Sequence, residues 1–249
     1  CGVAFIYVVA LIDKGMNINM MSRLAQQVII VLIPPLALIF LVLGMALVAF
    51  LVGVNLYQSG VQSAQEQQVA GQAERLVRMH SPVIGPREAP VTIVEFFDPA
   101  CETCRAFYPV VKDLMQQYPS EVRLVIRYAP FHQGSEQVVK LLESARQQDK
   151  YQAVLEAVLA AQPQWADHGN PNLELAYKAA EQAGLDMLRA RADMAAPTLD
   201  AVLQQDVQDL TALKVEKTPT FFVNGRALPS FGHKQLAELV AQEVSNSKK

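Results

Sequence analysis

Two cysteines with two residues between them are the feature of this sequence that points most directly to chemistry. Cys101 and Cys104 follow an apolar run, Val91–Phe97, and precede residues with apolar side chains at helical spacing. The pair is therefore expected at a strand-to-helix junction, with Cys101 at or near the helix N-terminus. The helix dipole and the unpaired N–H groups there stabilise a thiolate and lower its pKa. A cysteine pair at this spacing beside a strand–helix unit is typical of a redox motif.

Two structural roles for the pair are alternatives to redox chemistry. A permanent disulfide is disfavoured because a two-residue spacer strains the loop and keeps the bond reducible. A structural zinc site needs four ligands, and the only other cysteine is Cys1, so no second pair completes the set. Thiol–disulfide exchange is the favoured interpretation.

The chain from about residue 80 to residue 244 resembles the DsbA-like thioredoxin-fold thiol–disulfide oxidoreductases. Glu95 lies six residues before Cys101, where the thioredoxin superfamily carries a buried carboxylate beneath the disulfide. Pro109 lies five residues after Cys104, where the active-site helix of the family is kinked. The segment KTPTFFVNG, residues 217–225, resembles the cis-proline loop of the family.

This resemblance implies a role for each residue of the site. Cys101 is expected to be the exposed nucleophile, and Cys104 to resolve the mixed disulfide from one helical turn further in. Pro219 is expected to be cis and to leave the backbone of Thr218 free to pair with an extended substrate chain, the alternative being an ordinary proline at a strand start. Glu102 and Thr103, between the cysteines, are expected to contact the substrate too. No cofactor beyond the cysteine pair is expected.

Glu95 is the only charged residue in the apolar run Val91–Phe97. One interpretation places it at a solvated sheet edge. The favoured interpretation is a buried carboxyl group with a raised pKa, which takes the proton of Cys104 and returns it.

The remaining apolar patterns predict an α/β fold, namely a thioredoxin fold with an inserted helical domain. Residues 121–128 alternate between polar and apolar side chains, as a strand does. Residues 134–213 show helical spacing throughout, with Gly184 as a helix cap, and resemble the helical insertion of the DsbA-like family. Residues 220–228 contain an Asn-Gly hairpin signal, and residues 234–244 predict a last helix.

An uncharged apolar segment, residues 28–54, precedes this domain. As a helix it would measure about 40 Å, which exceeds the roughly 30 Å hydrocarbon core of a bilayer. A cleaved secretory signal is the alternative, but its apolar region spans only about 7–15 residues. The expected organisation is an N-terminal segment (1–27), one transmembrane helix (28–54), a stalk (55–79) and the catalytic domain (80–249).

Charge predicts the compartment. Lys14 and Arg23 precede the apolar segment, whereas the first basic residue after it is Arg75. The positive-inside rule therefore predicts a cytoplasmic N-terminus and an extracytoplasmic catalytic domain, anchored in the inner membrane of a bacterium. That compartment is oxidising and suits dithiol exchange. The net charge is −3 with no basic cluster, so nucleic acid is not an expected partner.

The direction of exchange is predicted from the residues between the cysteines. Strongly oxidising members of the family have a histidine there, whereas the negative charge of Glu102 is expected to raise the pKa of Cys101. That pKa is expected nearer the roughly 7 of thioredoxin than the roughly 3.5 of the strongest oxidant. Arg105 is expected to point into solvent, and Thr218 resembles the isomerase and reductase branches. Reduction or isomerisation is therefore favoured over strong oxidation. The expected partners are thiol- or disulfide-containing proteins and a membrane protein that regenerates the cysteine pair.

Two other functions are alternatives: a copper-binding module that uses the cysteine pair as ligands, and a redox-inert tethered chaperone. The sequence contains four scattered histidines. His132 is expected at the surface or at a helix cap, and Trp165, Asp167 and His168 are expected to pack where two helices connect.

Overall fold

The computed structural model describes residues 39–58 and 73–248 of the chain. They belong to two compact units, Cys1–Val61 and Gln62–Lys249, which we treat separately. The predicted segment 1–27, residues 28–38 of the predicted membrane helix and residues 59–72 of the predicted stalk lie outside the described residues.

The first unit contains one described helix, Ile39–Gln58, with a mean hydropathy of 2.6 and no buried side chains. A 20-residue helix measures about 30 Å, which matches the hydrocarbon core of a bilayer. This helix is the one candidate for a membrane span within the described ranges. Residues 39–54 of the predicted apolar helix are therefore helical, and the helix continues past the expected end at residue 54.

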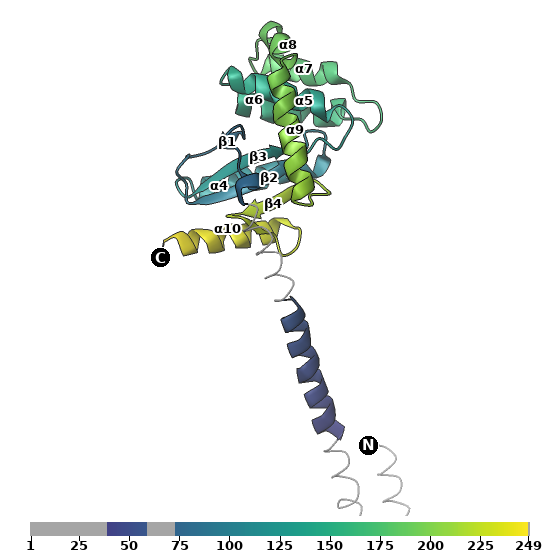
Figure 1. The fold of residues 1–249 in the computed structure, drawn as a ribbon, viewed down its shortest axis with the longest axis vertical. Coiled ribbons are helices and arrows are strands. Elements are labelled where there is room, and N and C mark those ends of the chain that lie inside the picture. Colours follow the sequence, from purple (N-terminus) through teal and green to yellow (C-terminus); the bar gives the residue numbers. More distant parts are fainter. Residues whose placement is uncertain (1–38, 59–72, 249) are drawn as a thin grey trace, which may run out of the picture. The chain divides into compact units, whose positions relative to one another are not determined.

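The second unit is built on a five-stranded sheet with the strand order β1-β3-β2-β4-β5 (Figure 1). Its two central strands, β2 and β3, are parallel, and every other pairing is antiparallel. The strands are β1 (Val83–Ile84), β2 (Val91–Phe97), β3 (Val122–Tyr128), β4 (Thr220–Val223) and β5 (Arg226–Ala227).

Alternation along β2 gives the sheet two apolar faces. Ile93 and Phe97 belong to the larger core cluster, and Val94 and Phe96 to the smaller one. Helices α4 (Glu102–Gln117) and α10 (His233–Ser247) contribute buried residues to the larger cluster. Helices α3 (Ala73–Leu76) and α9 (Pro197–Ala212) contribute to the smaller one.

The predicted helical insertion, residues 134–213, is confirmed. It contains α5 (Ser135–Gln147), α6 (Tyr151–Trp165), α7 (Leu173–Gln182), α8 (Met187–Met194) and α9. The first four gather beyond one end of the sheet, and α9 runs from that group across the sheet (Figure 1). Gly184 has φ +91° just after α7, as the predicted helix cap requires.

The end of the predicted stalk belongs to the domain. Leu76 is 2% exposed in the smaller core cluster. Arg78 Nε and Nη2 each donate to the Asp209 carboxylate at 2.7 Å. On the sheet, buried Arg127 donates to Asp206 and to Asp209. The predicted boundary at residue 80 is therefore wrong, because it cuts through a packed and ion-paired part of the domain.

Candidate active site

Asp98 organises the loop between β2 and α4. Its fully buried carboxylate accepts hydrogen bonds from the backbone N–H groups of Ala100 (2.9 Å), Phe131 (2.8 Å) and His132 (3.0 Å). The Ser135 hydroxyl donates to the same carboxylate. One side chain thus joins the loop that leads to the cysteines to the loop that follows β3.

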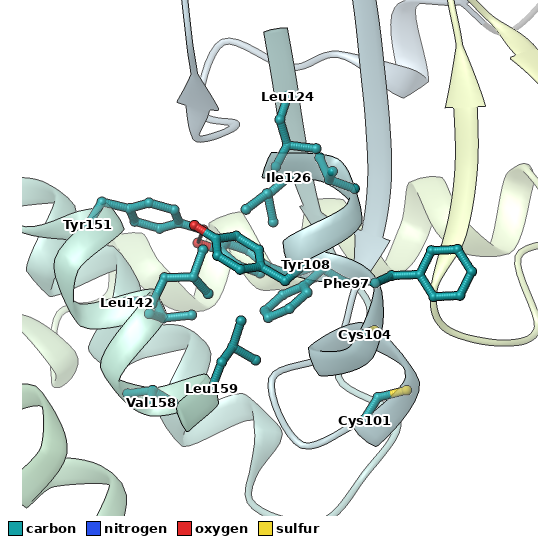
Figure 2. Packing of buried hydrophobic residues seen from close by; sticks show 14 of the residues in the cluster. Phe97, Cys101, Cys104, Tyr108, Leu124, Ile126, Leu142, Tyr151, Val158 and Leu159 are labelled. Atoms are coloured by element: carbon teal, nitrogen blue, oxygen red, sulfur yellow. Dashed lines mark hydrogen bonds between the residues drawn. The ribbon is translucent and has the colours of Figure 1, made fainter. Parts of the chain in front are cut away.

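Cys101 is the N-cap residue of α4 and is 5% exposed. Its pKa is lowered to about 5, chiefly by a side-chain hydrogen bond from Cys104, against the opposing effect of burial. The side chain of Thr218 and the backbone N–H groups of Cys104 and Thr103 lower it further. Figure 2 shows the Cys101 sulfur pointing away from the helical cluster around Leu159. The structure therefore has a thiolate-forming cysteine at the helix N-terminus, as the sequence predicted. The predicted exposure of Cys101 is wrong, because its side chain packs within the core and contacts the carbonyl oxygen of Thr218.

Cys104 lies one helical turn further along α4, is fully buried and lies 3.6 Å from Cys101. Both cysteines are free thiols. Burial raises the pKa of Cys104 well above that of an ordinary thiol, and the hydrogen bond to Cys101 and the charges of Glu95 and Cys101 act in the same direction. Cys104 therefore stays protonated and needs a base before it attacks a disulfide.

Glu95 is 1% exposed and lies in β2 opposite Ile126 and Phe221 of the neighbouring strands. Within the described residues, neither of its carboxyl oxygens has a hydrogen-bond partner. Burial raises the pKa of Glu95 to about 8, and the charge of Cys101 adds to the effect. A solvated edge position is thereby excluded, and the predicted burial is confirmed. The group is neutral at pH 7 and titrates close to it.

The loop before β4 places its proline beside the thiols. The Thr218–Pro219 peptide bond is cis, as the resemblance implied, and Pro219 is buried. The thiol of Cys101 donates to the carbonyl oxygen of Thr218 at 3.4 Å. Because β4 is antiparallel to β2, this loop lies at the end of the sheet where α4 begins.

The residues between the cysteines do not control the pKa of Cys101 in the predicted way. Glu102 and Thr103 are exposed, and Glu102 Oε1 accepts a hydrogen bond from His168 Nε2 at 2.8 Å. The largest influences on the pKa of Cys101 are its hydrogen-bond donors and burial, and Thr103 takes part through its backbone. The pKa of about 5 is slightly closer to the roughly 3.5 of the strongest oxidant than to the roughly 7 of thioredoxin, against the prediction, because these hydrogen bonds dominate.

Arg105 does not point into solvent. Its Nε donates to Gln162 Oε1 at 2.8 Å. Gln162 is 1% exposed, and its Nε2 donates to the carbonyl oxygens of Pro99 (2.8 Å) and Cys101 (3.0 Å). The sequence interpretation missed Gln162, although it continues the apolar face of α6 four residues after Val158.

Two histidines from separate loops meet beside the cysteines. His132 Nδ1 lies 2.7 Å from Asp98 Oδ2, and its ring centroid lies 5.7 Å from that of His168. Together with Ala100, these two residues line one small cavity. The prediction placed His132 at the surface or at a helix cap and did not include its contacts with Asp98 and His168. Trp165 is fully buried at the end of α6, and its carbonyl oxygen accepts the N–H of Asn172 just before α7, so it lies where the two helices connect, as predicted. His168 instead pairs with Glu102.

Metal binding was the main alternative from the sequence. In the ranges that the structure describes, no group of three or more histidine, cysteine or acidic side chains is arranged to hold a metal ion. The exposed pair His168–Glu102 and the half-buried pair His132–Asp98 are each satisfied by their own partner.

Comparison with known proteins places residues 78–242 in the thioredoxin family, whose model matches them. Among curated proteins, the chain is 37% identical over 147 residues to the Na(+)/H(+) antiporter NhaA 3 of Salinispora tropica, and 31% identical over 144 residues to the Na(+)/H(+) antiporter NhaA of Herminiimonas arsenicoxydans. Each match covers 58% of this chain but only 22% of the relative. The chain thus spans about a fifth of the length of these relatives.

The similar solved structures include a thioredoxin-like oxidoreductase and a thiol–disulfide exchange protein. A thioredoxin-like oxidoreductase from Silicibacter pomeroyi is 29% identical with a TM-score of 0.60, and the match covers 70% of this chain and 97% of that one. BdbD from Bacillus subtilis is 22% identical (TM-score 0.59, 67% and 94% covered). The thiol–disulfide exchange protein α-DsbA2 from Wolbachia pipientis is 15% identical (TM-score 0.63, 76% and 98% covered). The fold, the cysteine site and these matches together show that the chain belongs to the thioredoxin family and has the DsbA-like fold of its thiol–disulfide oxidoreductases.

Proposed function

We propose that this chain exchanges its Cys101–Cys104 disulfide with thiols and disulfides of other proteins. The observation that carries the proposal is the contrast between the two thiols. The pKa of Cys101 is lowered to about 5, whereas burial holds the pKa of Cys104 above the usual thiol range. One sulfur is therefore ready to attack at neutral pH, and the other waits for a base.

The exchange runs in two balanced steps. The Cys101 thiolate attacks a substrate disulfide, forms a mixed disulfide and releases one substrate thiolate. The ionised fraction of Glu95, which is small at pH 7, then takes the proton of Cys104. The resulting Cys104 thiolate attacks the Cys101 sulfur, forms the Cys101–Cys104 disulfide and releases the second substrate thiolate. The same steps in reverse oxidise a substrate dithiol. Glu95 suits the proton transfer because its pKa is raised to about 8, near the working pH.

Thr218 supports the binding of an extended substrate chain at the same place. Its carbonyl oxygen accepts the hydrogen bond of the Cys101 thiol, and this bond is lost when the thiol ionises. The backbone of Thr218 then becomes available to pair with the residue next to the substrate cysteine. The exposed side chains of Glu102 and Thr103 border the same position.

The redox potential that we propose is less reducing than the sequence suggested. A stabilised thiolate favours the dithiol form and makes a disulfide more oxidising. With a pKa of about 5, Cys101 lies between the roughly 7 of thioredoxin and the roughly 3.5 of DsbA. We therefore expect a potential between about −270 and −120 mV, which suits disulfide isomerisation better than one-way oxidation.

The location is part of the proposal. The apolar helix Ile39–Gln58 supports an anchor in the bacterial inner membrane, and the basic residues before it support an extracytoplasmic catalytic domain. A membrane protein would then restore the redox state of the pair. A reporter fused after Lys249 should be active only outside the cytoplasm, and activity of a cytoplasm-only reporter there would contradict this orientation.

Trapping tests the exchange itself. In the Cys104→Ala variant, the Cys101 mixed disulfide cannot be resolved, so substrate proteins should accumulate as adducts that a reductant releases. Cys101→Ala is the matched control and should trap none. Wild-type protein that neither forms adducts nor catalyses insulin reduction would contradict the proposed function.

A further inference from the structure

One ring nitrogen of His132, Nδ1, is hydrogen-bonded within the protein, whereas Nε2 has no hydrogen-bond partner among the described residues. Nδ1 lies 2.7 Å from Asp98 Oδ2, and the backbone N–H of His132 donates to the same oxygen at 3.0 Å. Asp98 is fully buried, whereas the side chain of His132 is 32% exposed. No other described residue forms a hydrogen bond with Nε2. The buried carboxylate therefore orients the ring and favours its protonated form.

Asp98 connects this ring to the loop that carries the nucleophile. Asp98 binds the N–H of Ala100 at 2.9 Å and, through its carbonyl oxygen, the N–H of Cys101 at 3.1 Å. Ala100 and His132 line the same cavity. The negative charge of Cys101 is among the groups that raise the pKa of His132, behind the hydrogen bond and charge of Asp98 and against the effect of burial.

The other titratable groups around the ring come from two elements. From α4, Glu102 adds to the rise in the pKa of His132. From the loop after α6, Asp167 lines the cavity, and His168 faces the ring at 5.7 Å between centroids. His168 Nε2 lies 2.8 Å from Glu102 Oε1, so these two side chains are paired with each other. His132 is bound instead to Asp98, whose backbone carbonyl oxygen accepts the N–H of Cys101.

We propose that His132 is a positioning residue for Cys101: held by Asp98, it supplies the positive charge that stabilises the Cys101 thiolate, a charge that neither residue between the cysteines provides. This inference rests on the proposed exchange reaction and deepens it. The charge comes from the loop after β3, far from the cysteines in sequence. The thiolate and the imidazolium stabilise each other, so each shifts the protonation equilibrium constant of the other by the same factor.

The first test is the His132→Asn variant, whose amide nitrogen replaces Nδ1 at Asp98 but carries no charge. The pKa of Cys101, read from the difference in thiolate absorbance between reduced and oxidised full-length protein, should rise by about one unit, which is tenfold in thiolate stability. At pH 7 the equilibrium constant for oxidation of glutathione should fall roughly tenfold with it. His80→Asn is the matched control, because His80 also binds a buried aspartate, Asp206, at 2.7 Å. It should leave the pKa of Cys101 unchanged.

A second test needs no substitution at His132. Its ring is titrated by NMR in the reduced and in the disulfide-bonded full-length protein. Because the disulfide removes the thiolate, the pKa of His132 should be about one unit higher in the reduced protein. An equal pKa in both forms, or an unchanged pKa of Cys101 in folded His132→Asn, would overturn the proposal. Both tests measure equilibria and do not depend on turnover. A protein without exchange activity would therefore contradict the proposed function only, and the two pKa measurements would still decide the role of His132.

Discussion

The side-chain amide of Gln162 donates a hydrogen bond to the carbonyl oxygen of Cys101 at 3.0 Å, although 61 residues separate the two in sequence. The same amide nitrogen binds the carbonyl oxygen of Pro99 at 2.8 Å. Gln162 belongs to α6 of the helical insertion, so the insertion directly holds the loop that carries the nucleophile. The helical insertion is therefore a structural part of the active site.

Gln162→Leu should therefore destabilise the fold. The change leaves the carbonyl oxygen of Pro99 without its side-chain donor, at a cost of about 1–3 kcal/mol, and it removes the partner of Arg105. The carbonyl oxygen of Cys101 loses one of two donors and keeps the backbone N–H of Arg105 at 3.2 Å. We expect the free energy of unfolding in urea to fall by roughly 2–4 kcal/mol. Gln152→Leu is the matched control on an exposed position of the same helix and should change it by less than about 0.5 kcal/mol. Equal effects of the two substitutions would show that the buried hydrogen bonds contribute nothing.

Glu95→Gln should flatten the pH dependence of stability. The pKa of Glu95 rises from an ordinary 4.5 to about 8 on folding, so the folded state binds the extra proton between these values. Stability from this group is present below pH 4.5 and is lost as pH rises through 8. Between pH 5 and pH 8 the wild type should lose roughly 3–4 kcal/mol relative to the variant. If the free energy of unfolding has the same pH dependence in the wild type and in the variant, then the pKa of Glu95 is the same in the folded and the unfolded chain.

Site-resolved alkylation should distinguish the two cysteines. The rate of iodoacetamide reaction at Cys101 follows its thiolate fraction, so it should rise through about pH 5 and level off by pH 7. Cys104 should stay unmodified over the same range in folded, reduced protein. A Cys101 rate that still increases between pH 7 and pH 9 would indicate an unperturbed thiol.

Leu76→Ala tests whether the segment before residue 80 belongs to the domain. Leu76 is 2% exposed, and its neighbour Val77 is 40% exposed. Removing a buried leucine side chain costs about 2–5 kcal/mol, so the melting temperature should fall clearly for Leu76→Ala. Val77→Ala, as the adjacent control, should have a much smaller effect. A negligible change in melting temperature for both variants would show that these residues do not belong to the folded domain.

The sequence predicted what local patterns determine. The apolar run before Cys101 identified β2, and helical spacing identified the insertion from residue 134 to residue 213. Glu95 stood out because a charge inside such a run is either at an edge or buried. Pro219 was recognised from its motif. In each case the informative residues are close together in the chain.

The rest of the site depends on contacts that no local pattern encodes. His132 and His168 lie in loops after β3 and α6, and only the folded insertion brings these loops together. Arg105 was expected in solvent because helical spacing does not reveal its partner, Gln162. The boundary at residue 80 was wrong for the same reason, since Arg78 finds Asp209 across 131 residues. Long-range polar contacts therefore account for most of the differences.

The unequal thiols also set the proton stoichiometry of the redox couple. Between pH 5 and pH 8 the reduced pair holds one proton, on Cys104, so a two-electron reduction takes up one proton and not two. For a two-electron couple this corresponds to about 30 mV per pH unit, half the slope of a free dithiol. Near pH 8 the thiolate charge that raises the pKa of Glu95 adds a further fraction of a proton on reduction. The potential of the protein would therefore change only half as steeply with ambient acidity as that of its unstructured thiol substrates.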